Sequence, residues 1–318
     1  MRIIRHHQSL PKEARGAAIA IGNFDGVHKG HQAVIREAGL IAKSHFIPWA
    51  VLTFEPHPRS VFQPNQPYFR LTPMRAKARA LESLGVNMMI VQHFSHSFSK
   101  QPAENFVKNV LVDGLGARHV VAGYDFVFGH NRGGNCELLL TMGQKLGFGF
   151  TAVSPIEDDG GILFSSTRIR DYLAKGDVRT AAALLGRHFS YEGRVARGDQ
   201  RGRTIGFPTL NLELRDAMRP SLGVYAARVG IIEKDKTILY DGVANLGKRP
   251  TFGGESVILE VHLFNFSKNL YGKRITVSLI DFIRQEKKFD GLEALRAQIA
   301  IDTEKAQNIL QSDLTQNQ

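Results

Sequence analysis

The sequence predicts a two-domain protein, in which an α/β domain is followed by a small all-β domain. Its 318 residues are enough for two domains of ordinary size. Before Gly186, short apolar runs alternate with segments of helical spacing. From His188 onward, short strands follow one another without helices between them. We therefore place the boundary at Gly186, which predicts domains 1–186 and 187–318.

The first domain alternates strands and helices along the chain. Its apolar or β-branched runs predict strands over Ala17–Ile21, Pro48–Phe54, Asn87–Val91, His119–Ala122 and Phe150–Ser154. Helical spacing predicts helices over Gln32–Ser44, Pro73–Leu84, Pro102–Leu111 and Cys136–Leu146. Thr72 is expected to cap the second of these, with Pro73 at its first position. This rhythm favours a mostly parallel sheet with helices on both faces and right-handed crossovers.

The end of the first domain and the second domain follow a different pattern. Ser165–Arg170 offers hydroxyl groups and two arginines at the start of a short helix, and Val178–Leu185 is also helical. The strands predicted after it are Phe189–Ala196, Gly223–Ile232, Thr237–Asn245, Val257–Phe264 and Arg274–Phe282. Such a series predicts a small closed barrel, against which the helix Leu292–Leu310 packs.

Composition narrows the class of protein. A hydrophobic fraction of 43% and a charged fraction of 22% are ordinary for a globular protein. The net charge of +11 favours anionic ligands, which are nucleic acids, acidic membranes or phosphorylated metabolites, but no long basic block indicates a nucleic-acid tail. One cysteine, Cys136, excludes an internal disulfide and a cysteine-based metal cluster. Without a signal peptide or a membrane-spanning run, we expect a cytoplasmic protein.

The stretch from Ala18 to His31 predicts a strand, a tight turn and the start of a helix. Its glycines allow close backbone approach to a ligand. His28 and His31 lie three residues apart, which places them on one face near the positive end of the helix. This arrangement suits phosphate, although it matches neither familiar glycine-rich phosphate loop. Histidine N–H groups suit nucleotidyl transfer, and a metal site is the other interpretation.

Two features of the second domain also indicate chemistry. The stretch from Gly198 to Asn211 is rich in glycine and arginine and ends in a run that contains Thr209 and Asn211. Glycines allow phosphate to approach the backbone, and these two side chains offer neutral oxygen ligands for Mg²⁺. Glu260 is a carboxylate within an apolar strand, which is costly if it is buried. A hairpin loop and an outward-facing strand residue are the plainer interpretations.

These motifs resemble those of the bacterial bifunctional riboflavin kinase/FMN adenylyltransferase family. Ile21–His31 is similar to its signature, and His28-Lys-Gly-His31 matches the His-x-Gly-His motif of nucleotidylyltransferases, which alone would indicate no more than that superfamily. Further stretches that resemble the family are Thr53–Pro58, Leu71–Lys77, Gly123–Gly134, Ser165–Arg170, Gly198–Asn211, Gly242–Thr251, Ile258–Leu263 and Asp281–Phe289.

The resemblance implies a Rossmann-like nucleotidylyltransferase domain followed by a riboflavin-kinase barrel. The barrel would phosphorylate riboflavin with ATP to FMN. The first domain would adenylylate FMN with a second ATP to FAD and release pyrophosphate. Mg²⁺ would serve as the cofactor, and the partners would be small molecules, with neither nucleic acid nor membrane. The oligomeric state stays open.

The resemblance also implies roles for individual residues. Glu260 would be the base of the kinase, and His28 and His31 would stabilise the adenylyl group. The residues implied to bind ATP or phosphate are Gly22, Phe24, Gly30, Ser165, Thr167, Arg168, Gly202 and Arg203. The residues implied to bind flavin are Asp125, His57 and Arg284, and those implied to bind Mg²⁺ are Thr209 and Asn211.

One residue departs from the family pattern. Leu210 stands where the kinase motif usually reads Pro-Thr-Ala-Asn, so its larger side chain would alter the kinase pocket. One active site instead of two is therefore an alternative. A flavin- or nucleic-acid-binding regulator that has kept the scaffold is a second alternative, and the retained His28, His31, Thr209, Asn211 and Glu260 argue against it.

Overall fold

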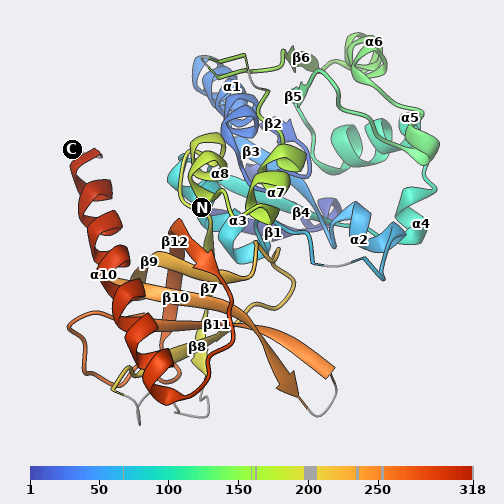
Figure 1. Ribbon diagram of the computed structural model, residues 1–318. Helices are drawn as coiled ribbons and strands as arrows, with labels where there is room; N and C mark the ends of the chain where they lie inside the picture. Colours follow the sequence, from blue (N-terminus) through green and yellow to red (C-terminus); the bar gives the residue numbers. More distant parts are fainter. Residues whose placement is uncertain are drawn as a thin grey trace. The chain divides into compact units, whose positions relative to one another are not determined.

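The chain forms two compact units, which are drawn in Figure 1 from a computed structural model. The structure describes residues 1–66, 68–158, 160–161, 163–196, 206–233, 236–251 and 254–316. The first unit comprises Met1–Pro67 and Thr72–Ser166, and the second comprises Tyr68–Leu71 and Thr167–Gln318.

The first unit is built on a six-stranded sheet in the order β1-β4-β3-β2-β5-β6, and its neighbouring strands are parallel. The strands are β1 (Arg2–Arg5), β2 (Ala18–Ile21), β3 (Trp49–Glu55), β4 (Met88–His93), β5 (His119–Gly123) and β6 (Gly149–Val153). The helices are α1 (Lys29–His45), α2 (Pro58–Phe62), α3 (Met74–Ser83), α4 (His96–Ser99), α5 (Ala103–Asn105), the π-helix Phe106–Gly114 and α6 (Cys136–Leu146). The predicted parallel α/β fold is confirmed.

Apolar side chains cover both faces of this sheet. In β2 every residue is buried, and Ile19 and Ile21 belong to the core on one face while Ala20 belongs to the core on the other. Burial on both faces is what a parallel sheet requires, and it explains why this strand reads as a continuous apolar run.

The order of the strands reverses at β2. After β2 the chain adds β3 and β4 on one side, and later adds β5 and β6 on the other. Ligands in open α/β sheets bind outside the carboxyl ends of the strands at such a reversal. The turn that follows Ile21 lies at this point of the sheet.

Three local features of the first unit differ from the sequence analysis or add to it. Strand β1 was not predicted, because it is a short edge strand in which three of four side chains are exposed. The segment predicted to be helical from Pro102 to Leu111 is helical, and most of it is the π-helix. Thr72 does not cap α3, which begins after Pro73 without a side-chain cap. Its hydroxyl instead accepts a hydrogen bond from the N–H of Gly26 at 2.8 Å.

The second unit contains the predicted antiparallel barrel. Its described strands close in the order β10-β11-β8-β7-β12-β9. They are β7 (Ser190–Ala196), β8 (Thr209–Glu213), β9 (Gly223–Ile232), β10 (Thr237–Thr251), β11 (Gly254–Leu263) and β12 (Arg274–Gln285). The long helix α10 (Leu292–Gln316) packs along the outside of β9, β10 and β12 (Figure 1). Strand β8 was expected to be part of a loop, because its Pro-Thr-Leu-Asn start reads as irregular.

Two short helices and a four-residue strap complete the second unit. The helices α7 (Ser166–Ala174) and α8 (Val178–Leu185) precede the barrel, and only Ser166 belongs to the first unit. The strap is Tyr68–Leu71, whose flanking residues belong to the first unit. The two compact units divide after Ser166. The division into domains 1–186 and 187–318, with one activity in each, stays a prediction.

The strap is held by the loop after β8 and by α7. The Arg70 guanidinium lies 2.9 Å from Asp216 Oδ2, and the carbonyl of Arg70 accepts a hydrogen bond from the N–H of Met218 at 2.8 Å. The side chain of Arg170 donates to the Phe69 carbonyl at 2.8 Å. The strap is therefore an integral part of the unit that carries the barrel.

Two glycines with similar left-handed backbones allow a matched test of the packing of the first unit. A Cβ at Gly129 (φ +73°) would lie 2.7 Å from the Cα of Ala103, whereas a Cβ at Gly147 (φ +82°) would meet open space. We expect Gly147→Ala to lower the free energy of unfolding by about 1 kcal/mol, the cost of the backbone alone. Gly129→Ala adds a clash with backbone, for a loss of roughly 3 kcal/mol.

Urea unfolding followed by tryptophan fluorescence measures this difference in the first unit, because Trp49 is the only tryptophan of the chain. Equal losses in the two variants would show that Ala103 does not constrain Gly129.

Candidate active sites

The turn between β2 and α1 has an unusual backbone. The N–H of Gly22 donates to the Leu52 carbonyl at 3.1 Å and so prolongs the pairing of β2 with β3. Phe24 (φ +48°) and Val27 (φ +43°) then adopt the left-handed conformation, which is unfavourable for residues with a Cβ. The ring of Phe24 folds back over Gly22, where an added Cβ would lie 3.1 Å from it. Glycine at position 22 makes room for this ring.

His28 and His31 meet at the start of α1. The Nδ1 atom of His28 accepts a hydrogen bond from the N–H of His31 at 3.3 Å, so His28 is the N-cap of the 17-residue helix. The two imidazole rings stack with their centroids 3.6 Å apart, and the edge of Phe24 contacts His31. An added Cβ at Gly30 would lie 3.2 Å from the ring of His28. The sequence-predicted pair therefore stands at the positive end of a long helix, which suits phosphate.

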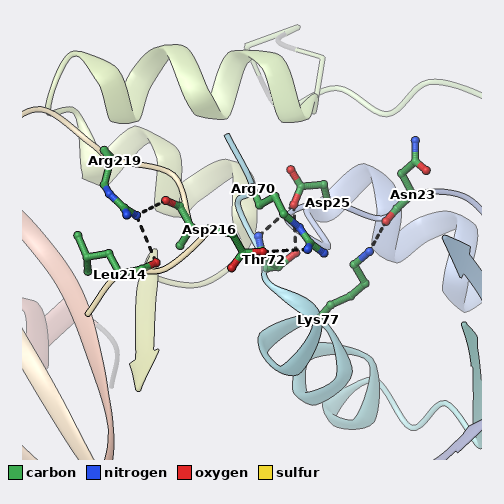
Figure 2. Close-up of polar contacts among 9 residues, drawn as sticks. Asn23, Asp25, Arg70, Thr72, Lys77, Leu214, Asp216 and Arg219 are labelled. Carbon is green, nitrogen blue, oxygen red and sulfur yellow. Dashed lines mark hydrogen bonds and ion pairs between the residues drawn. The ribbon is translucent and has the colours of Figure 1, made fainter. Parts of the chain in front are cut away.

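Hydrogen bonds of buried polar groups hold the turn in place, as Figure 2 shows for Asp25 and Thr72. Asp25 is 3% exposed, and its Oδ1 atom accepts from the Thr72 N–H at 3.0 Å. The hydroxyl of Ser166 donates to the Asp25 carbonyl at 2.7 Å. Because buried polar groups must be paired, these bonds specify one conformation of the turn. The sequence did not predict that Asp25 and Thr72 hold this turn, and Thr72 was expected to cap α3 instead.

The predicted flavin residues of the first unit follow the two strands that flank β2. His57 comes after β3, is buried, and accepts from the Arg59 N–H at 3.1 Å as the cap of α2. Asp125 comes after β5 and is exposed. Since parallel strands end at the same edge of a sheet, both residues lie at the edge that carries the turn after β2.

Cys136, the single thiol, lies beside the loop that contains Asp125. Its Sγ atom is 3.4 Å from the carbonyl oxygens of Gly123 and Tyr124. Burial raises the pKa of this thiol, and the charge of Asp125 raises it further. The group is therefore a protonated hydrogen-bond donor at neutral pH rather than a nucleophile.

The structure places Ser165 near the turn after β2, because its neighbour Ser166 bonds the Asp25 carbonyl and its other neighbour, Phe164, lies next to Gly30. Ser165 directly precedes α7, whereas Thr167 and Arg168 lie in α7, belong to the second unit and have exposed side chains. Gly202 and Arg203 lie outside the described residues.

The second candidate site is a row of polar residues across three strands of the barrel. In the strand register, Glu260 of β11 lies directly opposite Asn211 of β8 on one side. On its other side it lies opposite Asn245 of β10. Directly paired residues project from the same face of a sheet, so the three side chains share one face. Two of these residues were predicted from the sequence, and the structure brings them together.

Thr209 extends this row, and Leu210 does not belong to it. Thr209 is two residues from Asn211 on β8 and therefore shares its face, opposite His262. Leu210 is paired with the fully buried Val261 and projects from the opposite face. The departure from the usual family motif therefore falls on the side of β8 away from Thr209 and Asn211.

Arg284 is engaged in an ion pair with α10. Its Nε atom donates to both carboxylate oxygens of Asp302 at 3.0 Å, and Nη2 donates to Oδ2 at 2.7 Å. Asp302 is almost fully buried. Such a bidentate pair is geometrically specific, and here it fastens α10 to the barrel. The flavin contact of Arg284 stays a prediction, and it would have to coexist with this pair.

Asn245 was missed by reasoning from the sequence. Its segment was recognised as similar to the kinase, but an asparagine in an apolar strand carries no motif of its own. Only the pairing of β10 with β11 reveals that Asn245 lies opposite Glu260, since strand register is set by tertiary packing.

Comparison with known proteins assigns the chain to a family. Residues 10–168 match the family model of FAD synthetase, and residues 185–310 match that of riboflavin kinase. A relative from Haemophilus influenzae, a bifunctional riboflavin kinase/FMN adenylyltransferase, is 39% identical over 98% of this chain and 100% of its own. The protein of that name from Escherichia coli K12 is 40% identical over 95% of this chain and 96% of its own.

The chain belongs to the bifunctional riboflavin kinase/FMN adenylyltransferase family. It therefore phosphorylates riboflavin with ATP to FMN and adenylylates FMN with ATP to FAD. ATP and the flavins are its small-molecule substrates.

A solved structure of the same fold belongs to a Streptococcus pneumoniae protein described as a macrolide-efflux protein. It is 32% identical, has a TM-score of 0.85, and the match covers 97% of this chain and 99% of that one. For the present chain, no helix among the described residues has the length and apolar character needed to cross a membrane.

The capping role of His28 can be separated from its chemistry. Asparagine also caps helices well, so His28→Asn is expected to leave the free energy of unfolding nearly unchanged, whereas His28→Ala loses about 1 kcal/mol. Urea unfolding monitored by Trp49 fluorescence measures both. A loss in His28→Asn as large as in His28→Ala would show that the hydrogen bond to the His31 N–H does not stabilise α1.

Proposed function

We propose that adenylyl transfer takes place at the turn after β2, where His28 and His31 stabilise the α-phosphate of ATP. The attacking group, the FMN phosphate, is already anionic at neutral pH and needs no general base. The task is to align two anions and to stabilise charge as pyrophosphate leaves, for which imidazole N–H groups and a helix N-terminus are suited. Their shared position at the start of α1 supports this assignment.

In this proposal, the phosphates of ATP lie over the backbone of Gly22, Phe24 and Gly30. Phe24 acts through its main chain, because its ring is packed in the core. Ser165, Thr167 and Arg168 supply further donors and positive charge. His57 and Asp125 contact the flavin, since they follow the strands on either side of β2.

We further propose that phosphorylation takes place at the polar row of the barrel, with Glu260 as the base. The nucleophile is the neutral terminal hydroxyl of the ribityl chain, whose proton must leave as the γ-phosphoryl group arrives. Gly202 and Arg203 would bind the phosphates of ATP. The observation that carries the proposal is the register of β8 and β11, which pairs Glu260 with Asn211.

The residues of this row fit Mg²⁺. Thr209 and Asn211 present neutral oxygen atoms from one face of β8, as a hard cation requires. The Oδ1 atom of Asn211 is buried, and within the part of the chain that the structure describes it has no hydrogen-bond partner. When bound, the cation would neutralise charge on the ATP phosphates.

We expect both reactions to take place in the cytoplasm, as predicted from the sequence.

Two variants separate the two sites within one chain. In Glu260→Ala, the rate of FMN formation from riboflavin is expected to fall by roughly 10²-fold or more, because the general base is gone, whereas FAD formation from supplied FMN is kept.

In the double variant His28→Ala/His31→Ala, the rate of FAD formation is expected to fall by at least about 10²–10³-fold, whereas FMN formation is kept. Separation of FMN and FAD by chromatography after incubation with ATP and Mg²⁺ measures both. Loss of both activities in either folded variant would contradict the assignment.

The metal assignment has a matched control on the same strand. Asn211→Ala is expected to raise the Mg²⁺ concentration that gives half-maximal FMN formation by roughly 10–100-fold, as is typical when a metal site is disturbed. Leu210→Ala, on the opposite face of β8, is expected to leave this concentration unchanged. Titration of Mg²⁺ at saturating riboflavin and ATP provides the measurement. An equal shift in both variants would assign the effect to the strand rather than to the ligand.

A further inference from the structure

Lys77 is a buried cation that neither reaction has so far used. It lies in α3, and the residue is only 1% exposed. Lysine is almost never fully buried without a partner, because removing an ammonium group from water is costly. Its position in the helix explains the burial, since Met74, Ala78 and Leu81 at helical spacing form the face that packs on the core.

The ammonium group of Lys77 points to the turn after β2. Figure 2 shows the side chain reaching from α3 to the backbone of Asn23, where Nζ donates to the carbonyl oxygen at 2.6 Å. Nζ also lies 3.1 Å from the hydroxyl oxygen of Thr53 in β3. That hydroxyl, which is fully buried, donates to the same Asn23 carbonyl at 3.1 Å. Two buried donors from two different elements therefore converge on one carbonyl oxygen.

The orientation of this carbonyl bears on the histidines. The Asn23 carbonyl belongs to the peptide unit that enters Phe24, the first left-handed residue of the turn. The ring of Phe24 in turn contacts His31 with its centroid 5.4 Å away. The side chain of Asn23 is exposed, so the turn is held at this point through its main chain. Rotation of this peptide would move Phe24 and, with it, the ring of His31.

The charge of Lys77 has a second consequence. A neutral donor would be enough to bond the Asn23 carbonyl. The positive charge of Lys77, buried next to the turn, also attracts anions that bind to the turn from the solvent side. This attraction is screened less in a protein interior than in water. Such an attraction suits the proposed site, which has to bind two anionic substrates, ATP and FMN, next to each other.

We propose that Lys77, assisted by Thr53, is a positioning residue for adenylyl transfer that acts through the Asn23 carbonyl on Phe24 and His31. The inference rests on the proposed function of His28 and His31. Lys77 touches neither substrate nor phosphate in this scheme, and it holds the groups that do.

The variant Lys77→Met keeps the length of the side chain and removes its charge and donors. We expect kcat for FAD formation from FMN to fall by roughly 10²-fold, the cost of a misplaced catalytic group, with a smaller change in KM for ATP. FMN formation by the same molecules provides the internal control and is expected to stay within about twofold of the unmodified chain, because the kinase site lies in the other unit.

A double-mutant cycle distinguishes positioning from general destabilisation. In the His28→Ala/His31→Ala background, Lys77→Met is expected to lower the residual rate by less than about threefold, because residues that act as one unit are not additive. Leu111→Ala, a core variant from the opposite face of the sheet, controls for lost stability and is expected to leave kcat for FAD formation unchanged.

The inference is overturned if Lys77→Met keeps kcat within threefold, or if it costs the same factor in both backgrounds. If Lys77→Met does not fold by Trp49 fluorescence, Thr53→Val takes its place, since it removes one of the two donors to Asn23 and preserves shape. Its kcat is then expected to fall about tenfold, and an unchanged kcat would overturn the inference. If the double histidine variant itself keeps full FAD formation, the proposed function fails and the inference fails with it.

Discussion

The turn between β2 and α1 depends on buried hydrogen bonds that come from outside it. Its left-handed residues are unfavourable in an isolated peptide, at a cost of about 1–2 kcal/mol each. Donors and acceptors from β3, from α3 with the residue Thr72 before it, and from Ser166 at the start of α7 offset that cost by pairing with the main chain of Asn23, Asp25 and Gly26. Because these partners come from three separate stretches of chain, the turn forms only when the first unit is folded.

The two proposed sites would serve ATP chemistry in two ways. In our proposal, the helix N-terminus and the neighbouring imidazoles of the first unit offer donors to anions, and no carboxylate is required because the nucleophile is already charged. In the proposed barrel site the nucleophile is a neutral hydroxyl, which calls for a carboxylate, and Glu260 is paired with Asn211 and Asn245 on the adjacent strands. On this proposal, the difference in residue types follows from the ionisation of the two acceptors.

Reasoning from the sequence predicted most of the architecture and the main polar residues, because both leave local signals. Apolar runs separated by helical spacing predicted the parallel sheet, and His28 and His31 stood out by their three-residue spacing among glycines. The interactions of Thr72 were assigned wrongly, since a threonine before a proline is usually a helix cap, and here a distant backbone N–H competes for it. Lys77 and Asn245 matter through tertiary contacts, although the apolar neighbours of Lys77 at helical spacing were a usable hint.

The strap Tyr68–Leu71 makes the unit that carries the barrel a composite of two distant stretches of sequence. A genetic exchange at Gly186 that replaced one barrel by that of another family member would therefore not transplant the whole unit. It would leave the recipient's Arg70 facing the donor's counterpart of Asp216 and Met218. Substitutions at Arg70 and at Asp216 or Met218 are therefore expected to depend on one another during evolution, although these residues lie in distant parts of the sequence.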